Sequence, residues 1–274
     1  MTLTINGLPV DDAVGTDGQK SNEIDFGSGA ELKIAGVAAT GVTAAGLRAT
    51  TPSSACVFFD DFLGDTIKDE MQIKAGSGTG NAVALTTGAG GLVLMTSASD
   101  DGAITANASA LELAGLDWYA NKGGLAFETR LSLSDVSETY IFIGFTDATQ
   151  ASTLEEPLFL TTTAIDSTAT DACGVLYDVD GTTKQWLHGG VANGTDTTPA
   201  YSGAAPTQDA FHTVRVEVSA AGAVQGFIDG VPIGTPVASA VTPTVALLPI
   251  IVLANRSANV CTASVDYFWV QQNR

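Results

Sequence analysis

The sequence contains few of the side chains that most enzymes use for catalysis. It has two histidines, His188 and His212, in 274 residues. Neither lies in an H-E-x-x-H motif, and the chain has no G-x-S-x-G motif and no glycine-rich phosphate loop. What remains is paired-carboxylate glycosidase chemistry, which needs only two acids about 5 to 10 Å apart.

Adjacent acids are the candidates for such a pair. They include Asp60 and Asp61, Asp100 and Asp101, and Glu155 and Glu156. None belongs to an E-x-D-x-x-E pattern, in which alternate residues of one strand share a face. Neighbouring acids point to opposite faces of a strand, so we interpret these pairs as solvated. The sequence predicts no catalytic residue and no enzyme.

Metal and thiol chemistry are equally weakly indicated. Asp178 and Asp180 in DVDG alternate as calcium ligands do, but the distal ligands are missing and Asp-Gly is an ordinary turn signal. Cys56, Cys173 and Cys261 form no C-x-x-C pair. We predict no metal, no cofactor and three free thiols that are shielded in the native fold, with a Cys56–Cys261 bridge as the alternative.

One strand pair could present a ligand or interface face. Trp186 and His188 stand two residues apart, on one face of a predicted strand, and Tyr177 lies on the strand before it. An aromatic ring beside a polar group suits sugar stacking. Core packing or subunit contact explains the same residues, and we favour packing.

Charge excludes two partner classes. The net charge is -19, with 11 basic and 30 acidic residues, which repels nucleic-acid phosphates and anionic membrane surfaces. The N-terminus has no basic region followed by an apolar core, so we expect no Sec-type signal, and no apolar run is long enough to span a bilayer.

Alternating hydrophobicity predicts an all-β fold. Leu125, Phe127, Leu131 and Leu133 share one strand face in residues 124–134. Residues 139–146 are apolar on both faces, which predicts a central strand that is covered on both sides. Residues 211–219 and 261–270 predict two further strands. In the first, Val214, Val216 and Val218 point inward. In the second, Val265, Tyr267 and Trp269 are expected on one face.

Turns and helices complete this outline. Asp-Gly signals at 180–181 and 229–230 predict hairpins, and about a dozen short strands favour a β-sandwich. Short helices are expected near 64–71 and 108–119. Residues 1–55 contain Phe26 as their one aromatic residue and repeat GVAAT, GVTAA and GLRAT. We therefore predict an extended N-terminal arm, 1–55, before the sandwich, 56–274.

These segments together resemble a known family. CVFFDDF at 56–62, the run at 123–148, FHTVRVEVSAAGAVQGFIDGVPIG at 211–234 and VDYFWVQQ at 265–272 resemble the concanavalin A-like, laminin-G-like jelly roll. Within that fold the chain is similar to head decoration proteins of tailed bacteriophages. The glycoside hydrolase branch would need its acid motif, which is missing here. The resemblance implies binding or assembly rather than turnover.

The functional prediction is therefore a bacteriophage virion structural protein. It would be made in the host cytoplasm and would decorate the outer surface of the capsid, with its arm on the major capsid protein or another virion protein, and it would form a homo-oligomer. The alternative is a carbohydrate-binding module, free or on a virion or tail, whose ligand could be a host-surface glycan. An endoglycanase is the third hypothesis.

Overall fold

The computed structural model describes residues 55–86, 91–99, 104–115, 117–150 and 153–274, together with the backbone of 4–5 and 8–9. The chain divides into two compact units, Met1–Pro52 and Ser53–Arg274. In the first unit, β1 (Thr4–Ile5) pairs antiparallel with β2 (Leu8–Pro9). The pentad repeat lies outside the described residues, so the predicted arm stays a prediction.

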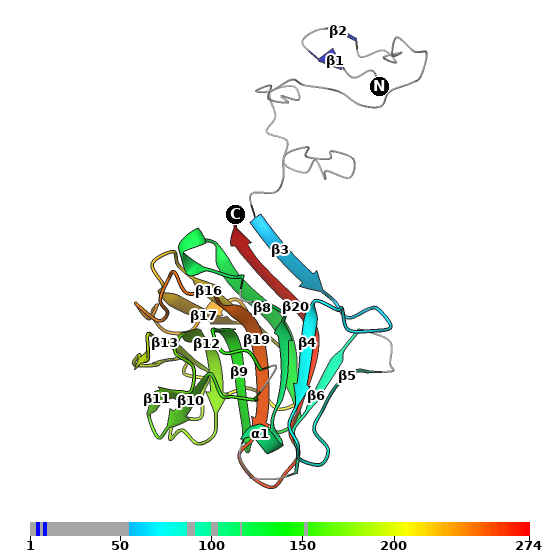
Figure 1. Cartoon of the computed structure of the whole chain (residues 1–274), viewed down its shortest axis with the longest axis vertical. Helices are drawn as coiled ribbons and strands as arrows, with labels where there is room; N and C mark the ends of the chain where they lie inside the picture. Colours follow the sequence, from blue (N-terminus) through cyan, green and yellow to red (C-terminus); the bar gives the residue numbers. More distant parts are fainter. Residues whose placement is uncertain are drawn as a thin grey trace. The chain divides into compact units, whose positions relative to one another are not determined.

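The second unit is built from two large antiparallel sheets (Figure 1). In spatial order, the first sheet contains β14 (Thr195–Asp196), β13 (Leu187–Ala192), β12 (Ala172–Asp178), β9 (Thr139–Thr146), β19 (Leu248–Asn255), β7 (Ser109–Leu113) and β4 (Met71–Ala75), with β15 (Ala200–Tyr201) paired to β13. We call it the capped sheet, because a hairpin packs over its outer face.

The second sheet contains, in order, β18 (Val231–Pro232), β17 (Val224–Ile228), β16 (His212–Val218), β8 (Leu125–Leu133), β20 (Thr262–Asn273), β6 (Val93–Thr96) and β5 (Ala82–Leu85), with β3 (Ala55–Asp60) paired to β20. The short helices of the described chain are α1 (Ile104–Asn107) and the 3-10 turn η1 (Ala120–Lys122). No helix among the described residues is long and apolar enough to cross a membrane.

The core lies between the two sheets and follows the alternation of the sequence. Val214, Val216 and Val218 of β16 point into it, as predicted. So do Leu125, Phe127, Leu131 and Leu133 of β8. The all-β sandwich is therefore confirmed for the described chain.

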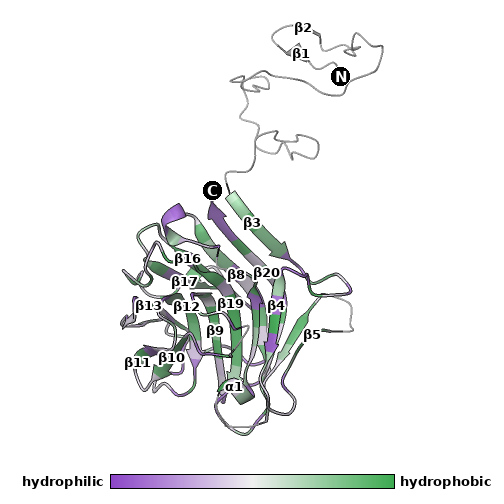
Figure 2. Cartoon of the chain, in the orientation of Figure 1, coloured by the Kyte–Doolittle hydropathy of each residue, from purple (hydrophilic) through white to green (hydrophobic). Residues whose placement is uncertain are grey.

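A second apolar cluster covers the other face of the capped sheet. β10 (Leu158–Thr161) and β11 (Ala164–Ser167) form a hairpin whose Leu158, Leu160 and Ile165 pack on that face. Every residue of β9 is consequently buried, and the capped sheet is hydrophobic along much of its length (Figure 2). The prediction of a strand that is covered on both faces is confirmed.

Both expected helices are wrong. Residues 64–70 form bends and turns, and β4 begins at Met71. In the other segment, β7 occupies Ser109–Leu113, where all five residues are buried. A strand that is buried on both faces has a continuous apolar run, and this run resembles a buried helix.

The second hairpin is confirmed, because Asp229 and Gly230 form the turn between β17 and β18 with φ of 52° and 78°. β12 and β13 also pair as predicted, but residues 179–186 join them in a longer loop, and Asp180 and Gly181 do not adopt the positive φ of a tight turn.

The prediction for β20 is wrong in one important respect. The pairing register shifts between Val265 and Tyr267, so Asp266 forms a bulge. A bulge adds one residue and reverses the alternation beyond it. Val265 points into the core, whereas Tyr267 and Trp269 point to the outer face and Phe268 fills the core instead.

The three cysteines are free, and Cys173 and Cys261 are buried. Cys56 is exposed, so the expectation that it is shielded is wrong. In the ladder it pairs with Gln272, eleven residues along the chain from Cys261, or roughly 35 Å at strand spacing. The alternative Cys56–Cys261 bridge is therefore excluded.

Candidate binding face

The three residues that the sequence offered as a ligand or interface face lie inside the sandwich. Trp186, Tyr177 and His188 are exposed by 1%, 2% and 0%. The rings of Tyr177 and Trp186 are 5.7 Å apart, and the Tyr177 hydroxyl donates to the Val136 carbonyl. Burial lowers the pKa of His188 to about 4. These side chains present no surface to a ligand, so the candidate site must lie elsewhere.

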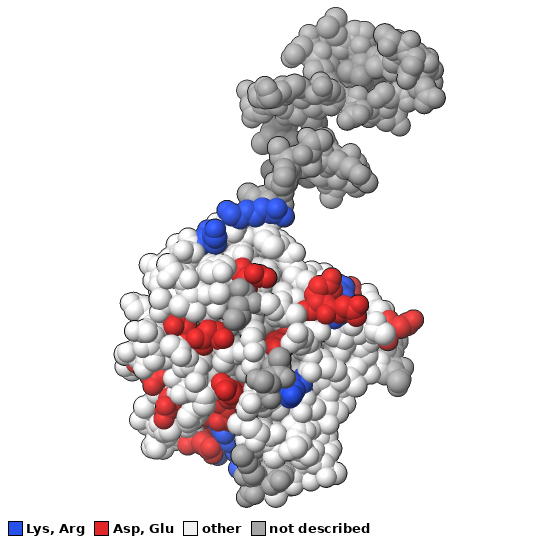
Figure 3. Space-filling model, in the orientation of Figure 1, with Lys and Arg blue, Asp and Glu red and all other residues white. Residues whose placement is uncertain are grey.

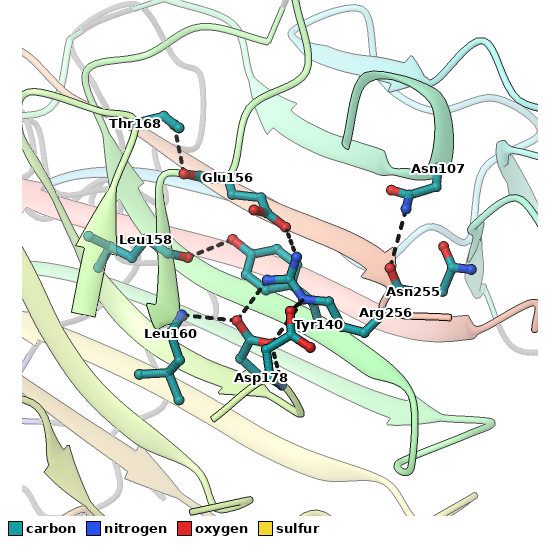
Figure 4. Close-up of polar contacts among 10 residues, drawn as sticks. Asn107, Tyr140, Glu156, Leu158, Leu160, Thr168, Asp178, Asn255 and Arg256 are labelled. Atoms are coloured by element: carbon teal, nitrogen blue, oxygen red, sulfur yellow. Dashed lines mark hydrogen bonds and ion pairs between the residues drawn. The ribbon is translucent and has the colours of Figure 1, made fainter. Parts of the chain in front are cut away.

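A polar cluster lies between the capped sheet and its covering hairpin (Figure 4). Arg256, which directly follows β19, donates through Nε and Nη2 to the two carboxylate oxygens of Asp178 at 3.0 and 2.7 Å. Its Nη1 lies 2.5 Å from Glu156, and its guanidinium carbon lies 4.6 Å from the Tyr140 ring centroid. Asp180 adds a third carboxylate, 3.2 Å from Nε.

This cluster fastens the hairpin to the sheet. Asp178 is fully buried and accepts the backbone N–H of Leu160 at 3.0 Å. The Tyr140 hydroxyl donates to the Leu158 carbonyl at 2.8 Å. Both oxygens of Asp178 are occupied by the guanidinium and by backbone N–H groups, which leaves neither directed at a cation or a substrate. The cluster is structural.

Glu156 makes the stability of the folded protein depend on pH. Burial raises its pKa to about 7, although Arg256 opposes the shift. A carboxyl group whose folded pKa exceeds its unfolded pKa of about 4.3 binds more protons in the folded state. Its stabilising contribution is therefore full below about pH 4.3 and is lost as the pH rises to 7.

We expect Glu156→Gln to remove this slope, that is, the fall in stability as the pH rises. The melting temperature of the wild type should fall between pH 5 and pH 8 relative to that of the variant. Thermal melts across this range measure the difference. Glu155→Gln, at the adjacent position, is the control and should keep the wild-type slope. A Glu156→Gln protein with an unchanged slope would contradict the assignment.

The second sheet has a different outer face, which carries both aromatic and charged side chains. One row crosses five paired strands in register, from Phe227 on β17 through Arg215 on β16, Glu128 on β8 and Trp269 on β20 to Phe59 on β3. At a strand spacing of about 4.8 Å the row spans roughly 19 Å. We call these five residues, with Tyr267, the Trp269 face.

Hydrogen bonds and ring contacts order this face. Arg215 donates to Glu128 at 3.1 Å and to Glu217 at 2.7 Å, and its guanidinium carbon lies 5.0 Å from the Trp269 ring centroid. The Tyr267 hydroxyl donates to Glu128 at 2.7 Å. The charged groups are thus held by one another, and the Trp269 and Tyr267 rings lie beside them in fixed positions.

The face is accessible. The side chains of Arg215 and Glu128 are exposed by 28% and 27%, Phe59 is exposed by 50%, and Trp269 is half-buried. Burial and the neighbouring Glu128 carboxylate raise the pKa of Tyr267. Tyr267 therefore remains a hydroxyl donor at neutral pH. The arrangement offers aromatic rings and hydrogen-bonding groups on one side of the sheet.

Beside the Trp269 face, His212 and Asp229 resemble a catalytic dyad. Nδ1 of His212 lies 2.8 Å from Asp229. The other ring nitrogen, Nε2, accepts the backbone N–H of Thr207 at 3.1 Å. A general base needs that nitrogen free to take a proton from a nucleophile. The pair therefore links the turn at Asp229 to Thr207 and Thr213 through hydrogen bonds.

Sequence reasoning missed the Trp269 face because the bulge at Asp266 reverses the expected alternation. Tyr267 and Trp269 seemed to belong with Val265 on one face, whereas they lie opposite it. The signal was the run VDYFWV itself, since three successive aromatic residues cannot all point into one core.

The two antiparallel sheets have the arrangement of a concanavalin A-like jelly-roll β-sandwich. Among solved structures, the chain is similar to the carbohydrate recognition domain of Emp47p, with a TM-score of 0.53 and 14% identity over 81% of this chain and 96% of that one. A prokaryotic β-1,3-1,4-glucanase from a mouse hindgut metagenome gives a TM-score of 0.52 and 12% identity over 78% and 98%.

A sialidase matches with a TM-score of 0.53 and 14% identity, over 80% of this chain and 18% of that one. No family model and no curated protein sequence matches the chain. At these identities the likeness shows the fold alone. The same fold carries both a recognition domain and a glucanase, so the choice between binding and catalysis depends on the residues of this chain.

Proposed function

We propose that the sandwich is a non-catalytic carbohydrate-binding domain and that the Trp269 face holds the glycan. The observation that carries the proposal is a half-buried tryptophan and a tyrosine on β20 beside the Arg215–Glu128 pair. Aromatic rings stack on the apolar faces of sugars, and the polar groups between them hydrogen-bond hydroxyls. The carbohydrate recognition domain among the compared structures supports the proposal at the level of fold.

The charge of the chain indicates which glycans to test. At -19, the protein repels polyanions such as uronic acid polymers and sulfated chains. Arg215 does not offset this effect, because its guanidinium is already paired with Glu128 and Glu217. We expect uncharged polysaccharides to bind.

The Trp269→Ala substitution tests the proposal. Loss of one stacking ring should weaken binding by at least about tenfold, or 1.4 kcal/mol, as measured on a glycan array and by co-sedimentation with insoluble neutral polysaccharides. Stability should change little, because the ring is half-buried. Tyr201→Ala, which removes an aromatic ring on β15, is the control and should bind as the wild type does. Retained binding in Trp269→Ala, or no binding by the wild type, would contradict the proposal.

The role as a capsid decoration protein stays a prediction. It depends on the sequence resemblance and on the predicted arm, most of which lies outside the described residues. Its location on a virion and its partners among virion proteins are predictions of the same kind. A carbohydrate-binding sandwich is compatible with that location, since the two roles use different parts of the chain.

A further inference from the structure

A carboxylate and a guanidinium lie at the centre of the Trp269 face. Glu128 is the register partner of Trp269 on β20 and of Arg215 on β16. Its Oε2 accepts a hydrogen bond from Arg215 Nη1 at 3.1 Å, and its Oε1 accepts the Tyr267 hydroxyl at 2.7 Å. Both charged side chains are partly exposed, so a ligand on this face can reach them.

The Glu128 carboxylate has acceptor capacity left. An ionised carboxylate has about four lone-pair sites, and two donors from the described residues reach this one. Asp178 differs, because two backbone N–H groups and two guanidinium nitrogens reach its oxygens and its side chain is fully buried. Each oxygen of Glu128 can therefore accept one further hydrogen bond from a ligand.

The Arg215 guanidinium has donors left as well. Its Nε donates to Glu217 at 2.7 Å and its Nη1 donates to Glu128. A guanidinium has more N–H groups than these two contacts use, and within the described part of the chain no acceptor is bonded to Nη2. The guanidinium carbon lies 5.0 Å from the Trp269 ring centroid. The remaining donors are therefore close to the ring on which a sugar would stack.

This acceptor and this donor are spaced for two neighbouring hydroxyls. Glu128 Oε2 and Arg215 Nη1 are 3.1 Å apart. Two gauche hydroxyl oxygens on adjacent carbons of a sugar ring are separated by a similar distance, about 3 Å. Each hydroxyl both donates and accepts, so one can donate to the carboxylate while its neighbour accepts from the guanidinium. A hydroxyl without a free neighbour satisfies only one of the two groups.

We infer that Glu128 and Arg215 select polysaccharides whose sugars have two free hydroxyls on adjacent carbons. The inference rests on the proposed function, since it names the ligand class of the same face. Stacking on Trp269 discriminates little between sugars, because most sugar rings have an apolar face. The paired hydrogen bonds discriminate more strongly, since a missing hydroxyl leaves a polar group of the site without a partner.

The charge of the protein restricts this class to uncharged chains. The net charge is -19, and acidic side chains are spread over the face of the sandwich that Figure 3 draws. Carboxylate or sulfate groups on a polysaccharide would be repelled. Hydroxyl groups would not, and a carboxylate such as Glu128 is a strong acceptor for them.

The linkage of a neutral polysaccharide decides whether it has such a pair of hydroxyls. A 1,4-linked hexose chain has free hydroxyls at C2 and C3, which are adjacent carbons. A 1,3-linked chain has them at C2, C4 and C6, so no two are adjacent. Chains of the same sugar with these two linkages therefore differ in the feature that Glu128 and Arg215 would recognise, while both are uncharged.

Binding of matched polymers to the full chain tests the inference. The pairs are 1,4- and 1,3-linked glucans and 1,4- and 1,3-linked galactans, long enough that chain ends are rare. Calorimetry measures the soluble polymers and co-sedimentation the insoluble ones. The wild type should bind at least one 1,4-linked polymer about tenfold or more tightly than its 1,3-linked counterpart. Equal affinity within each pair, or tighter binding of the 1,3-linked chains, would overturn the inference.

Two variants assign the preference to the carboxylate. Glu128→Gln keeps the size of the side chain and replaces one acceptor oxygen with a donor, so the preference should fall to within about threefold. Tyr267→Phe removes the hydroxyl that holds Glu128 and should lower the preference too. Glu155→Gln makes the same exchange in the loop before β10, outside the Trp269 face, and is the matched control. A Glu128→Gln protein with the wild-type preference would overturn the inference, whereas one that loses all binding with an unchanged melting temperature would support it.

The inference and the proposed function fail separately. The comparison of linkages uses the wild type, so it does not depend on the folding of any variant. If the wild type binds 1,4- and 1,3-linked chains equally and Trp269→Ala loses both, the selection by Glu128 and Arg215 is wrong and the Trp269 face remains the site. If the wild type binds none of the four polymers, the inference is overturned, and the glycan array then decides whether the proposed function stands.

Discussion

Replacing Arg256 with methionine is expected to destabilise the sandwich by about 3 to 5 kcal/mol, because it leaves buried carboxylates without their partner. Asp178 is fully buried, and Glu156 is exposed by only 12%. Urea unfolding monitored by circular dichroism measures the change. The covering hairpin should open first, since Asp178 and Tyr140 hold its backbone through Leu160 and Leu158.

Two further variants test whether the loss of stability comes from leaving buried carboxylates unpaired or from the loss of any arginine. Arg130→Met removes a surface ion pair, 2.7 Å from Asp266 with the arginine exposed by 44%, and should cost less than about 1 kcal/mol. Combining Arg256→Met with Asp178→Asn removes the unpaired charge, so the double variant should be more stable than the sum of the single effects predicts. An Arg256→Met protein within about 1 kcal/mol of the wild type would contradict the role of the cluster.

The second large effect is expected for Trp186→Ala. Truncation of a buried large aromatic costs about 3 to 5 kcal/mol, because the surrounding core relaxes only partly into the cavity. Trp186 is exposed by 1% and contacts the Tyr177 ring. Thermal and urea unfolding should show the loss, and glycan binding at temperatures where the variant remains folded should be unchanged.

Trp269→Ala is the matched comparison. It removes the same side chain from the outer face of the sandwich and should reverse the pattern, with binding lost and most of the stability kept. If Trp186→Ala melted like the wild type and lost binding, Trp186 would be the ligand residue and the Trp269 face would not be the site.

The local pattern of hydrophobic and turn residues in the sequence was sufficient to predict much of the fold. Strict alternation in residues 211–219 identified the buried valines of β16, because one face of that strand meets the core and the other meets solvent. The continuous apolar run at 139–146 identified a strand covered on both faces. Asp229 and Gly230 specified their turn through the positive φ that each adopts.

The candidate site needed long-range information. The sequence left Trp186 and His188 between a ligand face and a packing role, with packing favoured. It does not show that a second layer, the β10–β11 hairpin, buries one side of β13 while the other sheet buries its opposite side. Arg256 gave no signal at all, since its carboxylate partners lie 78 and 100 residues away in the chain.

By itself, the sequence determined several of the strands, the net charge of -19 and the missing catalytic motifs, because these depend on residue type and on spacing within one strand. The tertiary structure decided which aromatic residues face solvent. A single bulged residue, Asp266, moved Tyr267 and Trp269 to the outer face. The bulge depends on the register in which β20 pairs with β8 on one side and with β6 and β3 on the other. That pairing forms only when segments that are distant in the sequence come together.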